Sequence, residues 1–282
     1  MSKYVNNNGN LVSTEGYAIK VGNRGHLYGD GLFESIRVLK GHPINLENHL
    51  NRLRAGMEVM HMNYPDEFGV AFFEREIQAL LTKNEITGSA RIRLSIDRRR
   101  GGTFLPLSNH VDYLIEVDPI LPDKFELNAE GLKIDLYNDM KKQVNFLSQY
   151  KTKNCLIYIM GRLKAKEQAV DDLLILNDKM GIIESTSSNL FIVSNGVLYT
   201  PGVDLGCLGG TMRMQIINLA LKHNVKVYEC NISPQNLLAA DEVFLTNAIR
   251  GVMWVGTYRT KEYDNKFSQE LVEHLNKEWI KE

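Results

Sequence analysis

Two prolines interrupt the chain in the stretch Val117-Asp118-Pro119-Ile120-Leu121-Pro122-Asp123-Lys124. Proline fixes φ and has no backbone N–H, so a helix or a central strand does not continue through such a stretch. The 282 residues provide enough length for nearly two domains of roughly 150 residues. We therefore predict an N-terminal α/β domain over residues 1–118, a linker over residues 119–124 and a C-terminal domain over residues 125–282.

Hydrophobic periodicity predicts mixed α/β structure before the linker. Alternating or bounded apolar runs favour strands, and apolar residues at three- and four-residue spacing favour helices. The predicted strands are Leu32–Leu39, Pro43–Leu46, Ala90–Asp97 and Val111–Val117. The predicted helices run from Leu46 to Met60, with Asn45 as a candidate cap, and over Pro65–Lys83. A glycine turn at residues 40–42 joins the first two strands.

After the linker the pattern alternates irregularly, which argues against a plain doubly wound sheet. The predicted strands are Leu132–Tyr137, Leu173–Leu176, Asn189–Val193, Val197–Thr200, Val225–Cys230 and Glu242–Thr246. One helix is predicted to begin near Lys151, and two more are predicted over Gly210–His223 and Ser233–Ala239. Ser194-Asn195-Gly196 predicts a hairpin turn, because Asn-Gly adopts positive φ at low cost.

Composition excludes several classes of function. Hydrophobic residues make up 44% and charged residues 24% of the chain, and the net charge is −1, so nothing favours nucleic acid or an acidic membrane surface. No apolar run approaches the roughly 18 residues of a membrane span, and the first residues lack the apolar core of a secretory signal. Three widely spaced cysteines form neither a disulfide framework nor a zinc site. We therefore expect a cytoplasmic enzyme or small-molecule binder without a metal site.

A glycine-rich segment, residues 206–213, precedes the helix predicted over Gly210–His223 and reads Gly-Cys-Leu-Gly-Gly-Thr-Met-Arg. Glycines allow close approach of the backbone to a ligand, and the N–H groups at a helix start attract anions such as phosphate. The segment matches neither the dinucleotide glycine pattern nor a nucleotide P-loop. A plain loop before a helix is the alternative interpretation.

Two further residues are candidates for chemistry. Lys151, at the expected start of an apolar helix, could serve as a Schiff-base amine if burial beside another cation lowered its proton affinity. By composition alone, Lys153 competes for this role, and a solvated surface charge is the alternative for either lysine. Glu184 lies between an apolar strand and a run of hydroxyls, where it could be a turn cap or a buried acid held ionised by a cationic partner.

Five motifs along the chain carry a resemblance to a known family. They are Tyr28-Gly29-Asp30-Gly31-Leu32-Phe33-Glu34, His49-Leu50-Asn51-Arg52-Leu53, Lys151-x-x-Asn154, Glu184-Ser-Thr-Ser-Ser-Asn189-Leu-Phe191 and Gly210-Thr211-Met212-Arg213. In this order they resemble the class IV, or fold type IV, pyridoxal-phosphate enzymes: branched-chain and D-amino-acid aminotransferases and 4-amino-4-deoxychorismate lyase. The resemblance covers essentially the whole chain. It implies a mixed α+β fold with a smaller N-terminal α/β domain and a larger C-terminal pseudo-barrel domain.

The resemblance implies roles for individual residues. Lys151, marked by Asn154, would form the Schiff base with pyridoxal 5'-phosphate and move a proton on the substrate. Glu184 would pair with the protonated pyridine nitrogen, and Leu208 would pack on the ring. The residues that would bind the cofactor phosphate are Arg52, Gly210, Thr211, Met212, Thr246, Asn247 and Ala248. Phe33, Arg37 and Arg98 would face the substrate, although a solvated hairpin tip is the alternative for at least two of Arg98, Arg99 and Arg100.

The resemblance leaves three candidate functions, of which two are enzymatic and one is non-catalytic binding. The first is an aminotransferase acting on an amino acid, with branched-chain residues as candidates, and a 2-oxo acid. The second is 4-amino-4-deoxychorismate lyase, whose relatives often carry Asn-Ala where this chain has Asn247-Ala248. Residues 98–106 lack the Arg-x-His pair of D-amino-acid aminotransferases. The third is a binding protein on the same scaffold, which the presence of both Lys151 and Glu184 disfavours. Relatives are homodimers, so a homodimer is expected.

Overall fold

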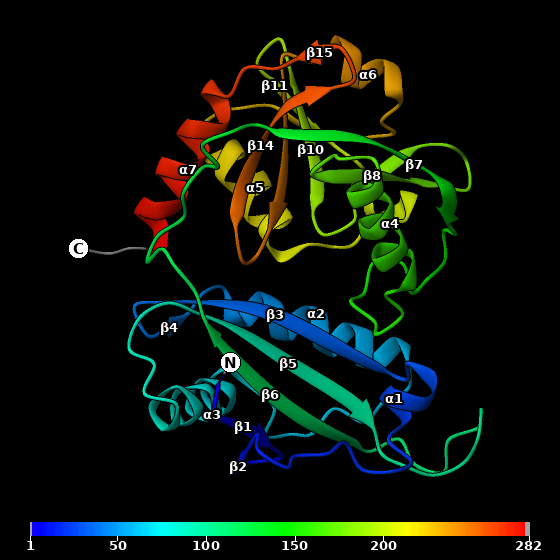
Figure 1. Ribbon diagram of the computed structural model, residues 1–282, viewed down its shortest axis with the longest axis vertical. Coiled ribbons are helices and arrows are strands. Elements are labelled where there is room, and N and C mark those ends of the chain that lie inside the picture. The colour runs from blue at the N-terminus through cyan, green and yellow to red at the C-terminus, as the bar shows by residue number, and fades with distance from the viewer. Residues whose placement is uncertain (1, 280–282) are drawn as a thin grey trace. The chain divides into compact units, whose positions relative to one another are not determined.

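A computed structural model describes residues 2–279 and divides them into two compact units (Figure 1). The first unit contains the chain up to Asp123 together with the segment Tyr150–Asn154, and the second contains Lys124–Gln149 and the chain from Cys155 onward. The division after Asp123 falls within the predicted linker. Each unit is described by itself.

The first unit is a sheet with two long helices on one face. Its elements are β1 (Tyr4–Asn7), β2 (Asn10–Ser13), α1 (Arg24–Tyr28), β3 (Gly31–Leu39), β4 (His42–Pro43), α2 (Leu46–Val59), α3 (Val70–Lys83), β5 (Ala90–Arg98) and β6 (Val111–Pro119). Within the described residues the strand order is β2-β1-β6-β5-β3-β4. Alternate residues of β3, β5 and β6, such as Ile36, Leu94 and Ile115, form one buried cluster with Leu53 of α2 and Ile77 of α3. The opposite face of these strands carries mostly polar and charged side chains, such as Ser35, Arg93 and Glu116, together with Phe33.

The segment Tyr150–Asn154 lies against the N-terminal half of β3. Thr152 forms an isolated bridge with Leu32, the N–H of Phe33 donates to the Lys151 carbonyl at 2.9 Å, and the N–H of Lys153 donates to the Gly31 carbonyl at 3.0 Å. The prediction of a helix starting near Lys151 is therefore wrong, because the backbone here is used to extend the sheet. The helix begins five residues later.

The second unit is built on a sheet that closes on itself. Its strands are β7 (Leu132–Lys142), β8 (Asp172–Asn177), β9 (Ile182–Ser185), β10 (Asn189–Ser194), β11 (Val197–Thr200), β12 (Val227–Glu229), β13 (Glu242–Asn247), β14 (Gly251–Tyr258) and β15 (Lys261–Glu262). Its helices are α4 (Leu156–Glu167), the 3₁₀ helix η1 (Val203–Leu205), α5 (Thr211–Lys222), α6 (Pro234–Ala239) and α7 (Lys266–Trp279). The order β10-β13-β14-β7-β8-β9 becomes a ring because β9 also pairs with β10. This ring is the expected pseudo-barrel.

The ring closes where Glu184 of β9 lies opposite Asn189 of β10. A register shift between β8 and β9 puts Ile182 opposite Leu176 but Glu184 opposite Ile175. Ile182 and Leu176 belong to one apolar cluster, whereas Ile175 belongs to a different cluster with Ala165 of α4. Because cross-strand partners share a face, the irregularity turns Glu184 away from the cluster that contains Ile182.

The structure confirms the mixed α/β class and most predicted elements, including the hairpin at residues 194–196, where Asn195 and Gly196 have φ of 50° and 73°. The helix predicted over Pro65–Lys83 begins at Val70, and the strand predicted over Pro43–Leu46 is only His42–Pro43. The hairpin of β1 and β2 was missed, although its turn is also Asn-Gly, with φ of 51° at Asn8 and 84° at Gly9. Polar asparagines hid the alternation that marks a strand.

Among residues 2–279, no helix is both long enough and apolar enough to cross a membrane.

Candidate active site

Lys151 is held on the polar face of the first unit's sheet. Its Nζ lies 4.5 Å from the centre of the Phe33 ring, and its carbonyl accepts the N–H of Phe33. The neighbouring lysine has a different environment, since the Lys153 ammonium group forms an ion pair with Asp97. The two lysines that composition could not separate are thus placed differently, with Lys151 on an aromatic ring and Lys153 on a carboxylate.

Two of the motifs meet where this segment passes the start of β3. A Cβ at Gly29, which has φ of 66°, would lie 2.7 Å from Oδ1 of Asn154. A Cβ at Gly31 would lie 2.5 Å from Oδ1 of Asp97 and 2.6 Å from the Ile96 carbonyl oxygen. Gly29 therefore allows the lysine segment to pass this close to the sheet, whereas Gly31 allows β3 to lie against β5 at Ile96 and Asp97.

Arg52 lies in a buried charge cluster with Glu34 and His49. Glu34 accepts the Nε–H of Arg52 at 2.8 Å and a second, short hydrogen bond from Nη2, so the guanidinium is gripped by both carboxylate oxygens. Nδ1 of His49 lies 2.6 Å from the same carboxylate. Burial raises the pKa of Glu34, but the Arg52 charge and the hydrogen bonds from His49 and Arg52 outweigh it and hold this pKa at about 2. Burial lowers the pKa of His49, which favours the neutral imidazole.

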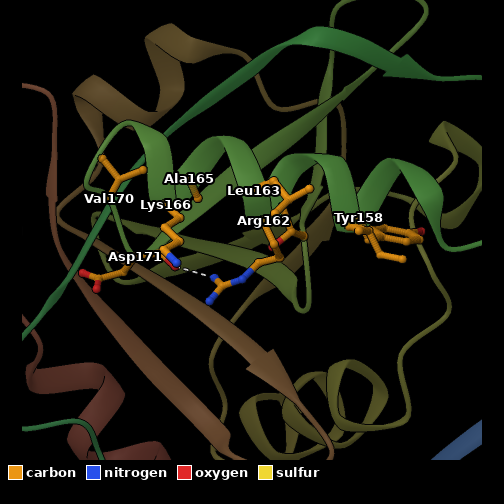
Figure 2. A pocket seen from close by; sticks show the side chains of 9 residues that line it. Tyr158, Arg162, Leu163, Ala165, Lys166, Val170 and Asp171 are labelled. Carbon is orange, nitrogen blue, oxygen red and sulfur yellow. Dashed lines mark hydrogen bonds between the residues drawn. The ribbon is translucent and has the colours of Figure 1, made fainter.

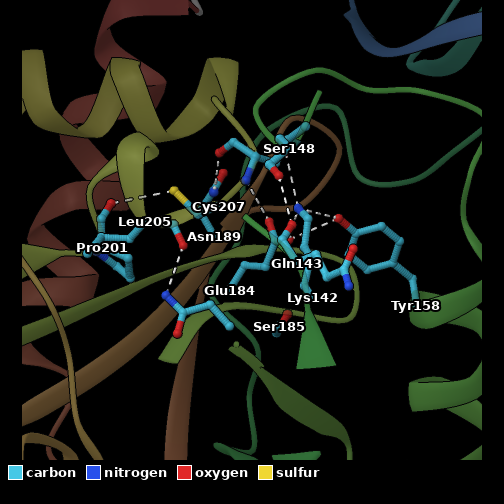
Figure 3. Close-up of polar contacts among 12 residues, drawn as sticks. Lys142, Gln143, Ser148, Tyr158, Glu184, Ser185, Asn189, Pro201, Leu205 and Cys207 are labelled. Carbon is cyan, nitrogen blue, oxygen red and sulfur yellow. Dashed lines mark hydrogen bonds and ion pairs between the residues drawn. The ribbon is translucent and has the colours of Figure 1, made fainter. Parts of the chain in front are cut away.

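Glu184 is the centre of a second buried network, shown in Figure 3, within the second unit. Its Oε1 accepts hydrogen bonds from Nζ of Lys142 at 2.7 Å and from the Tyr158 hydroxyl at 2.9 Å. Its Oε2 accepts the backbone N–H of Leu208 at 2.8 Å. Glu184 has 3% of its side chain exposed. The buried-acid interpretation, with a cationic partner, therefore describes this residue, and the turn-cap interpretation does not.

The start of α5 forms a site that suits an anion. Gly210 has no side chain to cap the helix, and the first turn of any helix carries backbone N–H groups without intrahelical partners. The amide of Asn189 donates to the Leu208 carbonyl at 2.7 Å and occupies the space that a Cβ at Gly210 would need. Thr246 lies directly opposite Asn189, so both side chains point to the same face. Within the described residues, the fully buried Oγ1 of Thr246 has no hydrogen-bond partner.

The remaining predicted residues of this region shape its backbone. Thr211 and Met212 are buried in the first turn of α5. Oδ1 of Asn247 accepts the N–H groups of Ile249 and Arg250, and its amide donates to Oγ of Ser188 at 3.0 Å. Asn247 therefore orders the turn after β13 that contains Ala248.

Two predicted substrate residues are engaged elsewhere in the first unit. Arg98 is buried and donates to Asp30, Asn109 and the carbonyls of His61 and Met60. These bonds hold the loop that follows β5, and they favour a structural role for Arg98 over the predicted contact with substrate. Arg37 is also buried, and its Nη2 donates to the Pro122 carbonyl at 2.6 Å, which anchors the linker.

The sequence interpretation missed three side chains that lie beside predicted ones. Cζ of Arg93 is 3.9 Å from the centre of the Phe33 ring, the ring that Lys151 also contacts. The alternation of the predicted strand Ala90–Asp97 could have indicated that Arg93 shares the polar face of β5. Lys142 and Tyr158 donate hydrogen bonds to Glu184. They are 42 and 26 residues away from it in sequence, so no local pattern links them.

A pocket of about 700 Å³ lies along α4, and none of its lining residues is a predicted site residue (Figure 2). It is lined by Tyr158, Ile159, Arg162, Leu163, Ala165, Lys166, Val170, Asp171 and Thr186. The Arg162 guanidinium, which could bind an anion there, donates to the Asp171 carbonyl. The pocket adjoins the network around Glu184 through Tyr158, which lines the pocket and donates to Glu184.

Comparison with known proteins identifies the family. The model of the amino-transferase class IV family matches residues 31–258. The chain belongs to the class IV aminotransferase family. A Methanocaldococcus jannaschii protein with the provisional name branched-chain-amino-acid aminotransferase is 27% identical over 96% of this chain and 93% of its own. The aminodeoxychorismate lyase of Vibrio harveyi is 26% identical over 83% of this chain and 85% of its own.

The fold also matches solved members of the family. The structure of the branched-chain aminotransferase of Thermoproteus uzoniensis matches with a TM-score of 0.88 and 22% sequence identity. The match covers 98% of this chain and 94% of the Thermoproteus chain. Other curated relatives are named D-alanine aminotransferases. The comparisons thus establish the class IV family and its fold.

We expect acid to weaken the folded state through Glu34. Because its folded pKa of about 2 lies below its ordinary 4.5, its contribution is present above pH 4.5 and is lost as pH falls toward about 2. This shift corresponds to on the order of 3 kcal/mol. The free energy of unfolding in urea should therefore be higher for wild type than for Glu34→Gln near neutral pH. This gap between the two proteins should shrink below about pH 4.5. Glu47→Gln, an exposed change on α2, should show no such gap; a gap that does not vary with pH would contradict the assignment.

Proposed function

We propose that this chain is a pyridoxal-phosphate-dependent aminotransferase that moves an amino group between an amino acid and a 2-oxo acid, with Lys151 as the Schiff-base lysine. The observation that carries the proposal is the family match over residues 31–258, because it spans Arg52, Lys151, Glu184 and the start of α5. When bound, pyridoxal phosphate supplies an electron sink for the carbanion formed at the substrate.

The anion site at the start of α5 fits the cofactor phosphate. The N–H groups of the first helical turn and the unpartnered Thr246 hydroxyl are donors suited to a phosphate dianion. We propose that Gly210, Thr211, Met212, Thr246, Asn247 and Ala248 form this part of the phosphate site. Arg52 would add a cation, and the fork made with Glu34 would orient its planar guanidinium.

Glu184 and Lys151 would then divide the proton chemistry. The Glu184 carboxylate would hold a proton at the pyridine nitrogen, which matters most as negative charge develops on the ring. The Lys151 amine would accept and return the substrate Cα proton as a general base and acid. Leu208, whose N–H fixes Glu184, would pack on the ring face.

The residues on the substrate side of the site suit the binding of an amino acid carboxylate. Arg93 brings a positive charge to the Phe33 ring, which Lys151 also contacts. We propose that Phe33 and Arg93 face the substrate, with branched-chain amino acids among the candidates, whereas the buried bonds of Arg37 and Arg98 favour structural roles. The second candidate is 4-amino-4-deoxychorismate lyase, which Asn247-Ala248 and the lyase relative favour. A cytoplasmic location stays a prediction.

The first test locates the cofactor. Purified protein reconstituted with pyridoxal phosphate should show the absorption of a lysine-bound cofactor, and borohydride reduction followed by peptide mapping should label Lys151. Lys151→Ala should abolish the label, whereas Lys153→Ala, which removes the ion pair with Asp97, should keep it. A label on Lys153 would overturn this assignment.

The second test separates the two enzymes. We expect L-branched-chain amino acids to convert bound cofactor to its pyridoxamine form and 2-oxo acids to reverse this, because transamination runs in two such half-reactions. Release of pyruvate from aminodeoxychorismate, measured with a coupled dehydrogenase on the same preparation, is the opposing outcome. Pyruvate release without amino transfer would assign the lyase reaction instead.

We further propose that the protein is a homodimer with α4 in its interface. Leu156, Ile159, Met160 and Leu163 lie at helical spacing and have 72%, 51%, 46% and 58% of their surface exposed, which is typical of a face covered by another protein surface. Sedimentation velocity should show a dimer for wild type and a monomer for Leu163→Lys. Leu221→Lys, on an equally exposed apolar residue of α5, should stay dimeric. A dimeric Leu163→Lys protein would remove α4 from the interface.

A further inference from the structure

The Lys142 ammonium group uses all three of its N–H donors inside the second unit. Nζ lies 2.7 Å from Oε1 of Glu184, 2.9 Å from the Tyr158 hydroxyl oxygen and 3.2 Å from the Ser148 carbonyl oxygen (Figure 3). The Lys142 side chain is 13% exposed and that of Glu184 is 3% exposed. A lysine so placed loses side-chain entropy and hydration, so its position has to be stabilised by these three partners.

The direction of each hydrogen bond in this network follows from the chemistry of its members. Burial, and then the neighbouring Glu184 charge, raise the pKa of Tyr158, so this residue remains a protonated phenol. Its O–H donates to Glu184 while its oxygen accepts from Lys142. The buried Cys207 thiol is also neutral, because burial raises its pKa to about 12. Lys142 is therefore the cation of this network, and the Leu208 N–H completes the grip on the second carboxylate oxygen.

We propose that Lys142 is a positioning residue for the reaction: it holds Glu184 as an oriented carboxylate, so that the proton shared with the cofactor stays on the pyridine nitrogen. This inference rests on the proposed function. An ammonium ion in contact with a carboxylate stabilises its ionised form, which makes transfer of the ring proton to Glu184 less favourable. Three donors on two oxygens also fix the plane of the carboxylate.

Lys142 also acts on the chain that leads to the Schiff-base lysine. Its bond to the Ser148 carbonyl is three residues before Lys151, and Ser148 is itself held by the side-chain bond of its hydroxyl to the Gln143 carbonyl at 3.1 Å. Lys142 thus connects Glu184, which would act at the ring nitrogen, to the loop before Lys151, which would act at the substrate carbon.

The test compares three variants with wild type as reconstituted holoenzymes. Lys142→Met removes the charge at similar length, and Lys142→Arg restores a cation. Lys141→Met is the matched control, because Lys141 is a half-buried lysine on the same strand whose Nζ donates to the local Asn138 carbonyl instead of to Glu184. We expect Lys142→Met to keep the cofactor but to lose at least about tenfold in kcat with little change in KM, and Lys142→Arg to recover most of the loss. The ¹⁵N resonance of ring-labelled cofactor should shift away from its protonated position in Lys142→Met alone.

A second measurement uses the apoprotein and does not depend on turnover. Removing Lys142 leaves Glu184 buried without its cation, so Lys142→Met should lower the unfolding temperature, and adding Glu184→Gln should restore part of the loss. Absence of this coupling would overturn the proposal, as would a Lys142→Met holoenzyme with the kcat and ring-nitrogen signal of Lys141→Met. If wild type never acquires the lysine-bound cofactor absorption, the proposed function itself fails. Normal absorption with no effect of Lys142→Met contradicts the inference alone.

Discussion

The pairing of β9 with β10 at Glu184 and Asn189 is the contact on which the second unit depends. Without it, β9 would be an edge strand with unpaired backbone groups, and the strand order would be an open sheet. With it, the loop at Leu208 and the start of α5 are brought beside the closing pair through the side chains of Glu184 and Asn189. The same two residues that close the ring therefore also hold Leu208 and the segment that leads into α5.

Glu34 and Glu184, two of the buried carboxylates in the described part of the chain, follow one physical rule with different partners. An isolated charge in a protein interior costs several kcal/mol, so each carboxylate is matched by a cation and by further donors. Glu34 is matched by the planar fork of Arg52 together with His49, and Glu184 by the point charge of Lys142 together with Tyr158. The fork constrains the orientation of the guanidinium, whereas the ammonium group leaves the carboxylate oriented by several donors at once.

Sequence reasoning recovered what depends on local pattern. Apolar spacing located the central strands and the long helices, and Asn-Gly located the turn at Asn195, because these signals reside in a few consecutive residues. The motifs that contain Glu184 and Gly210 are local for the same reason, and the roles that they imply stay predictions. It could not locate Lys142 or Tyr158, since their contacts with Glu184 join β7 and α4 to β9, elements that are far apart in the chain. It did not foresee the buried hydrogen bonds of Arg98, because a basic loop has the same composition whether its arginines face a ligand or bond to carbonyls.

The segment Tyr150–Asn154 shows how the fold fixes the position of Lys151. Its sequence neighbours on both sides belong to the second unit, yet its backbone extends the sheet of the first unit through bonds to Gly31 and Phe33. A lysine on a free connecting loop would sample many positions, because a loop has few backbone partners. Strand-like bonding removes that freedom without requiring a helix, and Gly29 is a condition for it, because a Cβ there would meet Oδ1 of Asn154. Gly29 of the first motif and Asn154 of the third are therefore coupled by this close approach, although they are far apart in the sequence.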